Sequence, residues 1–462
     1  MIMPVTKLLF TQFTKKRPGF RLLIALMVGV WVCLASLGTA SATTIERVIS
    51  PGGVEAWLVE DHSLPLITVK IAFRGGSSQD PEGKAGLANL VSGLIDEGAG
   101  ELDSLGFQGR MRELAISLQF QTGRDMFEGN LKTLTEHSDE AFRLLQLALN
   151  EPRFDEEPVE RIRAQILNGI RASQQDPTYI ARRAWLDSAL PGRAYARDRT
   201  GNIETVTAIS EEDMRVYVAN IFARENLMVA VVGDIDAVRL AEVLDQVFGA
   251  LPESPTLVSI PDIEPVTGPV RRIVELDIPQ AIVRFGHTGP ARNDPDFIPA
   301  FVVNHILGGG SFSSRLYKEV REKRGLAYSV YTYLLPLEHV AFFIGAVATQ
   351  NERVAETVET IEAEIRRMAE EGPSEAELAS AKSYLIGSYA LRFDTGEKIA
   401  EQLIAIQKAN LGIDYINDRN GMIEAITIED VRRVARNLLT VDGLITTIVG
   451  MPVGVTEINV DG

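Results

Sequence analysis

The stretch Ile209–Gly233 decides the fold, and it reads ISEEDMRVYVANIFARENLMVAVVG. The hydroxyl residue Ser210 precedes an amphipathic segment, and Asp213 follows it three positions later. This spacing predicts a helix that begins with a capping box. The apolar, β-branched run that follows ends at Gly233 and predicts a buried strand. The stretch is therefore predicted to be one helix–strand unit.

The same unit occurs a second time in the chain. Ile426–Gly450 reads ITIEDVRRVARNLLTVDGLITTIVG and aligns with the first copy without gaps, at an offset of 217 residues. Thr427 and Asp430 repeat the capping pattern of the first copy. A match of 25 residues, separated by about half the length of the chain, indicates an internal duplication.

The beginnings of the two halves agree as well. In the first half, residues 67–74 alternate, and after an Asp-Pro loop we expect an apolar helix that reaches about Glu97. In the second half, residues 281–285 alternate, and after another Asp-Pro loop we expect an apolar helix that ends at the glycines 308–310. Both halves mix strands and helices in the same order, which predicts an α+β fold of two similar domains.

Four segments are predicted along the chain. Residues 1–42 combine a basic stretch, an apolar stretch and the small-residue site 40–42, which is typical of a cleaved signal peptide and predicts export to the periplasm. The alternative is a membrane anchor, because 17 apolar residues nearly span a bilayer. An N-terminal domain is predicted over 43–252, a proline-punctuated linker over 253–270 and a C-terminal domain over 271–462.

Charge and cysteine content exclude several functional classes. The formal net charge is −17, and removal of residues 1–42 deletes five cations and no acid, which gives −22. Such an anionic protein is not expected to bind nucleic acid or anionic lipid non-specifically. Cys33 is the only cysteine, so the chain after residue 42 has no thiol nucleophile and no zinc–thiolate site. The Gly-x-Ser-x-Gly elbow of a serine hydrolase does not occur.

The most specific motif is Leu307–Tyr333, LGGGSFSSRLYKEVREKRGLAYSVYTY. Together with Arg224–Gly233 and the Asp-Pro loops, it resembles the pitrilysin/insulinase family of zinc metallopeptidases, which includes mitochondrial processing peptidase. The resemblance covers nearly all of the chain after residue 42. It implies two homologous domains, each a mixed, mostly antiparallel sheet covered by helices, that face each other as half-shells around a peptide.

The resemblance also locates a metal site that this chain lacks. Catalytic members carry His-x-x-Glu-His on the first helix of the first domain, where two imidazoles hold zinc and the glutamate activates water. The motif falls here on Asn89, Ser92 and Gly93. The third ligand, a glutamate on a later helix, falls near Asn168 or Gly169. These positions are degenerate, and the chain's five histidines lie more than four residues apart, so no metal or other cofactor is expected in this chain.

The candidate catalytic residues are Arg321 and Tyr328 in the segment REKRGLAY. The resemblance implies that this pair points at a zinc site, where the tyrosine donates to the oxyanion and the arginine holds a substrate carbonyl. The alternative is that residues 318–324 form a solvated, charged helix end, to which we assign Arg324, and that Tyr328 is an ordinary strand aromatic. By the same resemblance, residues 117–131 supply the edge strand for an extended peptide; the alternative is a plain hairpin.

Some members of this family are heterodimers in which one chain brings zinc and the other brings the arginine and tyrosine. The leading hypothesis is therefore a non-catalytic subunit of a periplasmic heterodimeric zinc metallopeptidase, inactive alone. It would bind extended peptides and pair with a paralogous catalytic subunit that carries zinc and the intact motif. Neither nucleic acid nor, after signal cleavage, a membrane is expected as a partner. The alternative is an inert pseudo-peptidase that binds peptides or acts as a scaffold.

Overall fold

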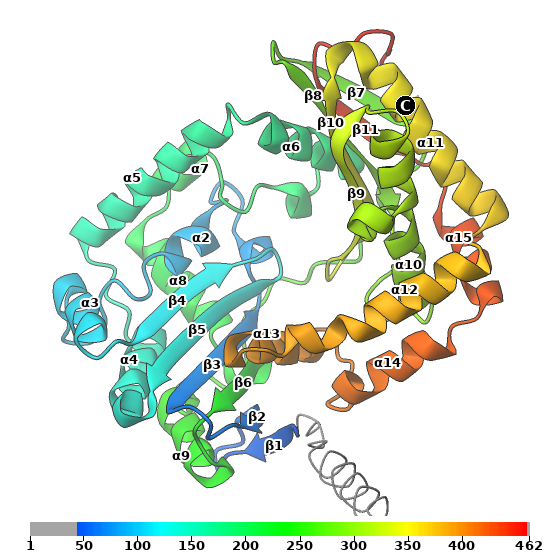
Figure 1. Ribbon diagram of the computed structural model, residues 1–462. Helices are drawn as coiled ribbons and strands as arrows, with labels where there is room; N and C mark the ends of the chain where they lie inside the picture. The colour runs from blue at the N-terminus through cyan, green and yellow to red at the C-terminus, as the bar shows by residue number, and fades with distance from the viewer. Residues whose placement is uncertain (1–43, 460–462) are drawn as a thin grey trace, which may run out of the picture. The chain divides into compact units, whose positions relative to one another are not determined.

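The computed structural model describes residues 44–459, which contain two β-sheets with helices packed against them (Figure 1). The predicted signal peptide, residues 1–42, lies outside the described residues. The first sheet has six strands, which in spatial order are β1 (Glu46–Ile49), β2 (Glu55–Glu60), β6 (Leu227–Gly233), β3 (Leu66–Arg74), β5 (Met126–Leu134) and β4 (Ser117–Thr122).

The second sheet repeats the topology of the first without an equivalent of β1. Its five strands in spatial order are β7 (Val270–Glu275), β11 (Ile445–Gly450), β8 (Gln280–Thr288), β10 (Ala341–Gln350) and β9 (Ala327–Pro336). The β2–β6 and β7–β11 pairs are parallel, and the corresponding pairs that follow in each sheet are antiparallel. The predicted α+β fold with two similar, mostly antiparallel sheets is confirmed.

The helices fall into the same two groups. Those before residue 250 are α2 (Leu87–Ser92), α3 (Ser104–Glu113), α4 (Ser138–Asn150), α5 (Glu156–Ser173), α6 (Pro177–Ala189), α7 (Ile203–Thr207), α8 (Glu211–Ile221) and α9 (Ala237–Phe248). Those after it are α10 (Phe297–Asn304), α11 (Val354–Glu371), α12 (Glu375–Gly387), α13 (Gly396–Lys408), α14 (Tyr415–Ala425) and α15 (Ile428–Leu438). No helix within residues 44–459 is long and apolar enough to cross a membrane.

The duplicated unit forms as predicted. The helices α8 and α15 both begin with a complete capping box, formed by Ser210 with Asp213 and by Thr427 with Asp430. Each strand that follows ends at a glycine with positive φ, 134° at Gly233 and 149° at Gly450. A Cβ on Gly233 would lie 2.0 Å from the carbonyl oxygen of Leu66, so the β2–β6–β3 arrangement requires glycine there.

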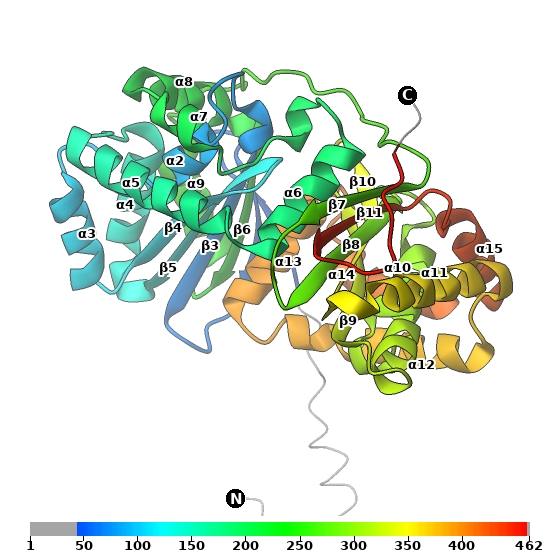
Figure 2. The same ribbon diagram turned by 90° about the horizontal axis from the view of Figure 1, so that it is seen from above.

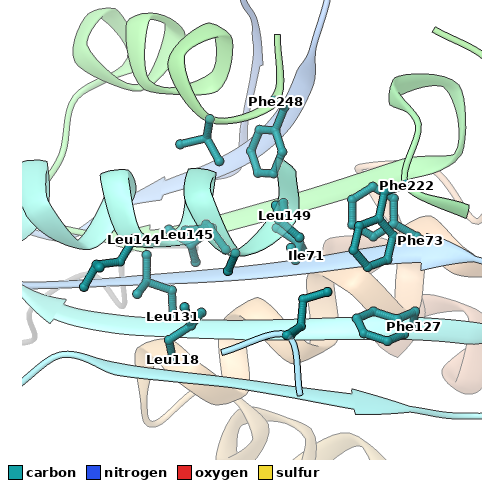
Figure 3. Close-up of a cluster of buried hydrophobic side chains, with 14 of the residues drawn as sticks. Ile71, Phe73, Leu118, Phe127, Leu131, Leu144, Leu145, Leu149, Phe222 and Phe248 are labelled. Atoms are coloured by element: carbon teal, nitrogen blue, oxygen red, sulfur yellow. The ribbon is translucent and has the colours of Figure 1, made fainter. Parts of the chain in front are cut away.

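The first sheet buries one face against its own helices. Figure 3 shows Phe73 and Phe127 of this sheet beside Phe222, which follows α8. The ring centroids of Phe73 and Phe222 are 4.7 Å apart in a stacked pair, and those of Phe127 and Phe222 are 5.0 Å apart. Leu145 and Leu149 of α4 belong to the same fully packed cluster. This cluster is the core predicted from the alternation of residues 67–74.

The opposite face of each sheet is covered by a helix from the other half of the chain. Helix α13 packs on β3 and β6, and α6 packs on β7, β8 and β11 (Figures 1 and 2). Leu403 and Ile404 of α13 are buried with Ala72 of β3. On the second sheet, the buried indole of Trp185 in α6 donates a hydrogen bond of 2.8 Å to the carbonyl of Ile445. Each half of the chain thus contributes one helix, α6 or α13, to the sheet of the other half. This reciprocal exchange of helices holds the two halves together.

Two local predictions differ from the structure. The apolar helix expected to reach Glu97 ends at Ser92, where Gly93 caps it, and turns follow. The second apolar helix changes to π-helical geometry at His305–Gly309 before it reaches the end of the glycine run. The predicted linker, residues 253–270, contains no helix, and only its last residue lies in a strand, β7. The domain boundaries themselves stay a prediction.

Candidate functional site: the Arg321–Tyr328 pair and the degenerate metal helix

Arg321 and Tyr328 lie against each other in the structure. The guanidinium carbon of Arg321 is 4.5 Å from the ring centroid of Tyr328. It is also 4.9 Å from the ring centroid of Tyr317, and the guanidinium donates a hydrogen bond to the Tyr317 hydroxyl. Arg321 is therefore held between two aromatic rings, in cation–π contact with both.

The local backbone explains this arrangement. Arg321 belongs to the π-helical segment Tyr317–Glu322, in which Tyr317 and Val320 are buried. A left-handed turn at Gly325, with φ of 58°, leads into β9. The sequence motif did not identify Tyr317, although its i, i+4 spacing from Arg321 is a usable signal for a side-chain pair on a helix.

A β-bulge turns Tyr328 outward. In the pairing of β9 with β10, Val330 faces Val347 and Ala327 faces Thr349, so Tyr328 and Ser329 together oppose one residue of β10. Both bulge residues are exposed, and Tyr328 has 81% of its surface accessible. Within residues 44–459 its hydroxyl has no hydrogen-bond partner. The second sheet therefore presents an unpaired phenol beside a fixed guanidinium on an edge strand.

Arg324 follows the end of the π-helical segment and is exposed. It donates to the carboxylate of Glu319 at 2.7 Å and to the Glu319 carbonyl at 2.9 Å. Lys323 donates to the same carboxylate at 2.6 Å. Glu319 is only 7% exposed, and these two cations lower its pKa although burial acts against them. Arg324 is thus exposed, as its assignment to the solvated helix end expects, and its guanidinium also contacts the buried Glu319 carboxylate.

Asn89 and Ser92 lie on the short helix α2, which Gly93 caps, and Gly169 lies on α5. Asn89 is half-buried, and Ser92 is buried with its hydroxyl donating to the Asn89 carbonyl at 2.8 Å. A Cβ on Gly93 would lie 3.1 Å from the side chain of Ile162 on α5. Gly169 on α5 is exposed. Within residues 44–459 no group of three His, Cys, Asp or Glu side chains is arranged to hold a metal ion.

A buried carboxylate positions the degenerate helix. The Asp80 side chain accepts hydrogen bonds from the backbone amides of Gly86 at 2.8 Å and Ala88 at 2.9 Å. Asp80 is 3% exposed, and burial raises its pKa from 3.8 to about 7. The group lies in the Asp-Pro loop whose sequence pattern marks the start of the helix. Its two hydrogen bonds orient the first turn of α2.

The predicted peptide-binding strand is an edge strand. β4 forms a hairpin with β5 and ends the six-stranded sheet. Its equivalent in the second sheet is β9, which carries Tyr328. The structure thus brings Arg321 and Tyr328 together and places β4 and β9 each at an edge of its sheet, the position at which strand addition by a peptide takes place.

Known proteins with related sequences match both halves. Residues 56–202 match the insulinase (peptidase family M16) family model, and residues 208–385 match the peptidase M16 inactive domain. The non-peptidase homolog YmxG of Helicobacter pylori is 29% identical over 81% of this chain and 85% of its own length. An uncharacterized zinc protease of Streptomyces coelicolor is 27% identical over 86% of this chain and 87% of its own length. A crystal structure of a peptidase M16 inactive domain from Pseudomonas fluorescens superposes with a TM-score of 0.83 at 26% identity, covering 90% of this chain and all of that one.

The two sheets of matching topology and the reciprocal exchange of α6 and α13 define an α+β fold built from two similar halves. The chain belongs to the insulinase family, peptidase family M16. Among its relatives, the Helicobacter pylori protein is named a non-peptidase homolog, and the Pseudomonas fluorescens structure is described as an inactive domain.

Proposed function

We propose that this chain is the non-catalytic subunit of a periplasmic heterodimeric zinc metallopeptidase. It binds extended peptides and supplies Arg321 and Tyr328 to the zinc site of a paralogous partner chain. Zinc and the His-x-x-Glu-His motif belong to that partner. The chain alone hydrolyses no peptide, since residues 89, 92 and 93 carry neither a metal ligand nor a general base.

The observation that carries the proposal is the state of the Arg321–Tyr328 pair. An oxyanion donor acts only if its hydrogen is free to reach the developing charge. The Tyr328 ring is 81% exposed and its hydroxyl has no partner within the described residues, while Arg321 is fixed against its ring face. This is a preorganised donor without a local acceptor, which fits an acceptor supplied by another chain.

The open strand edges support the peptide-binding part of the proposal. A peptide that adds to β4 or β9 pairs its backbone with the unpaired edge and needs no specific side chains to gain affinity. Tyr328 lies on β9 itself, so a peptide on that edge passes the phenol directly. The substrate is therefore proposed to be an unfolded or extended segment rather than a folded protein.

A second candidate is an inert pseudo-peptidase that binds peptides or assembles a complex without contributing to chemistry. The name of the Helicobacter pylori relative, a non-peptidase homolog, favours it. The two candidates make different predictions for Tyr328, because binding alone has no use for a hydrogen-bond donor aimed at an oxyanion.

The deciding experiment uses this chain together with a paralogue from the same organism that has the intact motif. Each is purified alone and as a mixture, and cleavage of an unfolded protein substrate is measured. We expect co-purification of the two chains and cleavage only by the complex. A partner that cleaves equally well without this chain would favour the scaffold. N-terminal sequencing of the protein from the native cell tests export; a start at Met1 would overturn the periplasmic location.

A further inference from the structure

A cavity of about 340 Å³ lies in the second half, away from the Arg321–Tyr328 pair. Its walls come from the end of β9 and from α10, α13 and α14, which are labelled in Figure 1. Apolar side chains such as Phe297, Phe301 and Leu334 line it together with three arginines: Arg292, Arg392 and Arg419. The volume is in the range of sites that hold small organic molecules.

The three arginines lack acidic partners. Within residues 44–459, none of them forms an ion pair with a carboxylate. Arg419 is only 6% exposed and donates to neutral oxygens, the Leu385 carbonyl at 3.0 Å and Asn420 Oδ1 at 3.1 Å. Burial lowers the pKa of Arg419, and the nearby Arg292 and Arg392 lower it further. Three clustered cations in a chain of net charge −17 constitute an uncompensated positive site.

Aromatic rings fix the two inner guanidinium groups. The guanidinium carbon of Arg292 lies 4.3 Å from the ring centroid of Phe297, and its nitrogen donates to the Tyr415 hydroxyl at 2.7 Å. The guanidinium carbon of Arg419 lies 4.1 Å from the ring centroid of Tyr389. Stacking restrains the plane of a guanidinium and leaves its N–H edge available for an oxyanion, which is the arrangement that suits bidentate recognition.

Asn304, on α10, adds an amide to the wall of the same cavity. The residue is 5% exposed, and within residues 44–459 its Oδ1 atom has no hydrogen-bond partner. The wall is therefore not wholly apolar between the arginines.

We propose that this cavity binds a small phosphate ester, with the phosphate between Arg292, Arg392 and Arg419 and an apolar body against Phe297, Phe301 and Leu334. Phosphate fits better than a single carboxylate because three cations face one site, and a phosphate monoester carries close to two negative charges and three acceptor oxygens. The same chemistry occurs on anionic lipid headgroups. The size of the cavity and the strongly negative charge of the protein favour a free small molecule.

The test is calorimetric titration of the full chain at low salt with phenyl phosphate, inorganic phosphate and uncharged benzyl alcohol. We expect saturable binding of phenyl phosphate, weaker binding of inorganic phosphate and none of benzyl alcohol. Arg392→Gln is the informative variant, because Arg392 is exposed and its loss leaves no buried group unpaired. It is expected to weaken phenyl phosphate binding by about tenfold or more, the loss typical of one charge-assisted contact.

Arg366→Gln is the matched control, since Arg366 is an exposed arginine on α11 outside the cavity and its loss changes the net charge equally. We expect it to bind as the wild type does. An equal loss of affinity in both variants, or no saturable binding of phenyl phosphate at millimolar concentration, would overturn the proposal. Sedimentation with vesicles that contain phosphatidic acid distinguishes a free phosphate ester from an anionic lipid headgroup. Binding to the vesicles without binding of phenyl phosphate would refute the small-molecule ligand.

Discussion

Replacing Tyr328 by phenylalanine tests the shared active site with the least structural change. The substitution removes one hydroxyl from a ring that is 81% exposed. That hydroxyl has no partner within residues 44–459, so its loss leaves no group of this chain unpaired. The ring remains above Arg321 at the 4.5 Å observed in the structure. We therefore expect the free energy of unfolding to change by less than about 0.5 kcal/mol, as is usual for exposed substitutions.

The expected catalytic effect is much larger. If Tyr328 donates to the oxyanion on the partner's zinc site, its loss removes one transition-state hydrogen bond. Loss of one such donor typically lowers kcat about 10²–10³-fold, or about 2.7–4 kcal/mol of transition-state stabilisation. KM should stay near the wild-type value, because a contact formed only in the transition state does not contribute to ground-state binding.

The assay compares peptide cleavage by complexes of the partner with wild-type, Tyr328→Phe and Tyr331→Phe chains. Tyr331 is the matched control, since it lies on the same strand, is 45% exposed and loses the same hydroxyl. Gel filtration of each complex checks assembly. A Tyr328→Phe complex that assembles normally and cleaves at the wild-type rate refutes the shared site, and the peptide-binding scaffold then becomes the better explanation.

Four further outcomes are expected. If Arg321 holds a substrate carbonyl in ground and transition states alike, Arg321→Ala should lower kcat and also raise KM; an unchanged KM would contradict the substrate contact. Trp185→Phe should lower the free energy of unfolding in urea by about 1–3 kcal/mol, because the carbonyl of Ile445 loses its donor; an unchanged free energy of unfolding would show that this hydrogen bond does not stabilise the contact between α6 and the second sheet. Burial raises the pKa of Asp80 to about 7, so the stability that its protonation provides is complete below about pH 4 and is lost as the pH rises through 7. Denaturation midpoints measured against pH should therefore fall less steeply for Asp80→Asn than for the wild type. If the two curves of midpoint against pH run parallel, Asp80 is not the source of the decline. Metal analysis of the dialysed chain should find less than one zinc per molecule, and one tightly held zinc would show that the degenerate helix has been misidentified.

Local signals in the sequence were sufficient to predict the repeated helix–strand unit. The capping boxes at Ser210 and Thr427 formed as predicted, because each depends only on side chains and backbone within four residues. Helix α11 ends at Gly372, whose φ of 70° is a value that a residue with a Cβ rarely adopts. These features require no knowledge of the rest of the molecule.

The candidate site was predicted in part. The family motif identified Arg321 and Tyr328, and the structure places them in contact. It did not identify Tyr317, the second ring around Arg321, or the β-bulge that exposes Tyr328. A bulge depends on the register between β9 and β10, which is set by the packing of the whole sheet rather than by the residues in the bulge.

The sequence by itself determined the duplication and the order of strands and helices, because periodicity and helix caps are local properties. Only the tertiary structure decided which surfaces are buried. The alternation of residues 67–74 predicted one buried face for β3, yet Thr68, Lys70 and Ala72 are buried too, because α13 arrives from more than 320 residues later in the chain to cover them. Tertiary packing also forms the cluster of Arg292, Arg392 and Arg419. These residues lie on segments that are far apart in the sequence and come together only when the helices pack, so no local sequence pattern predicts the cluster.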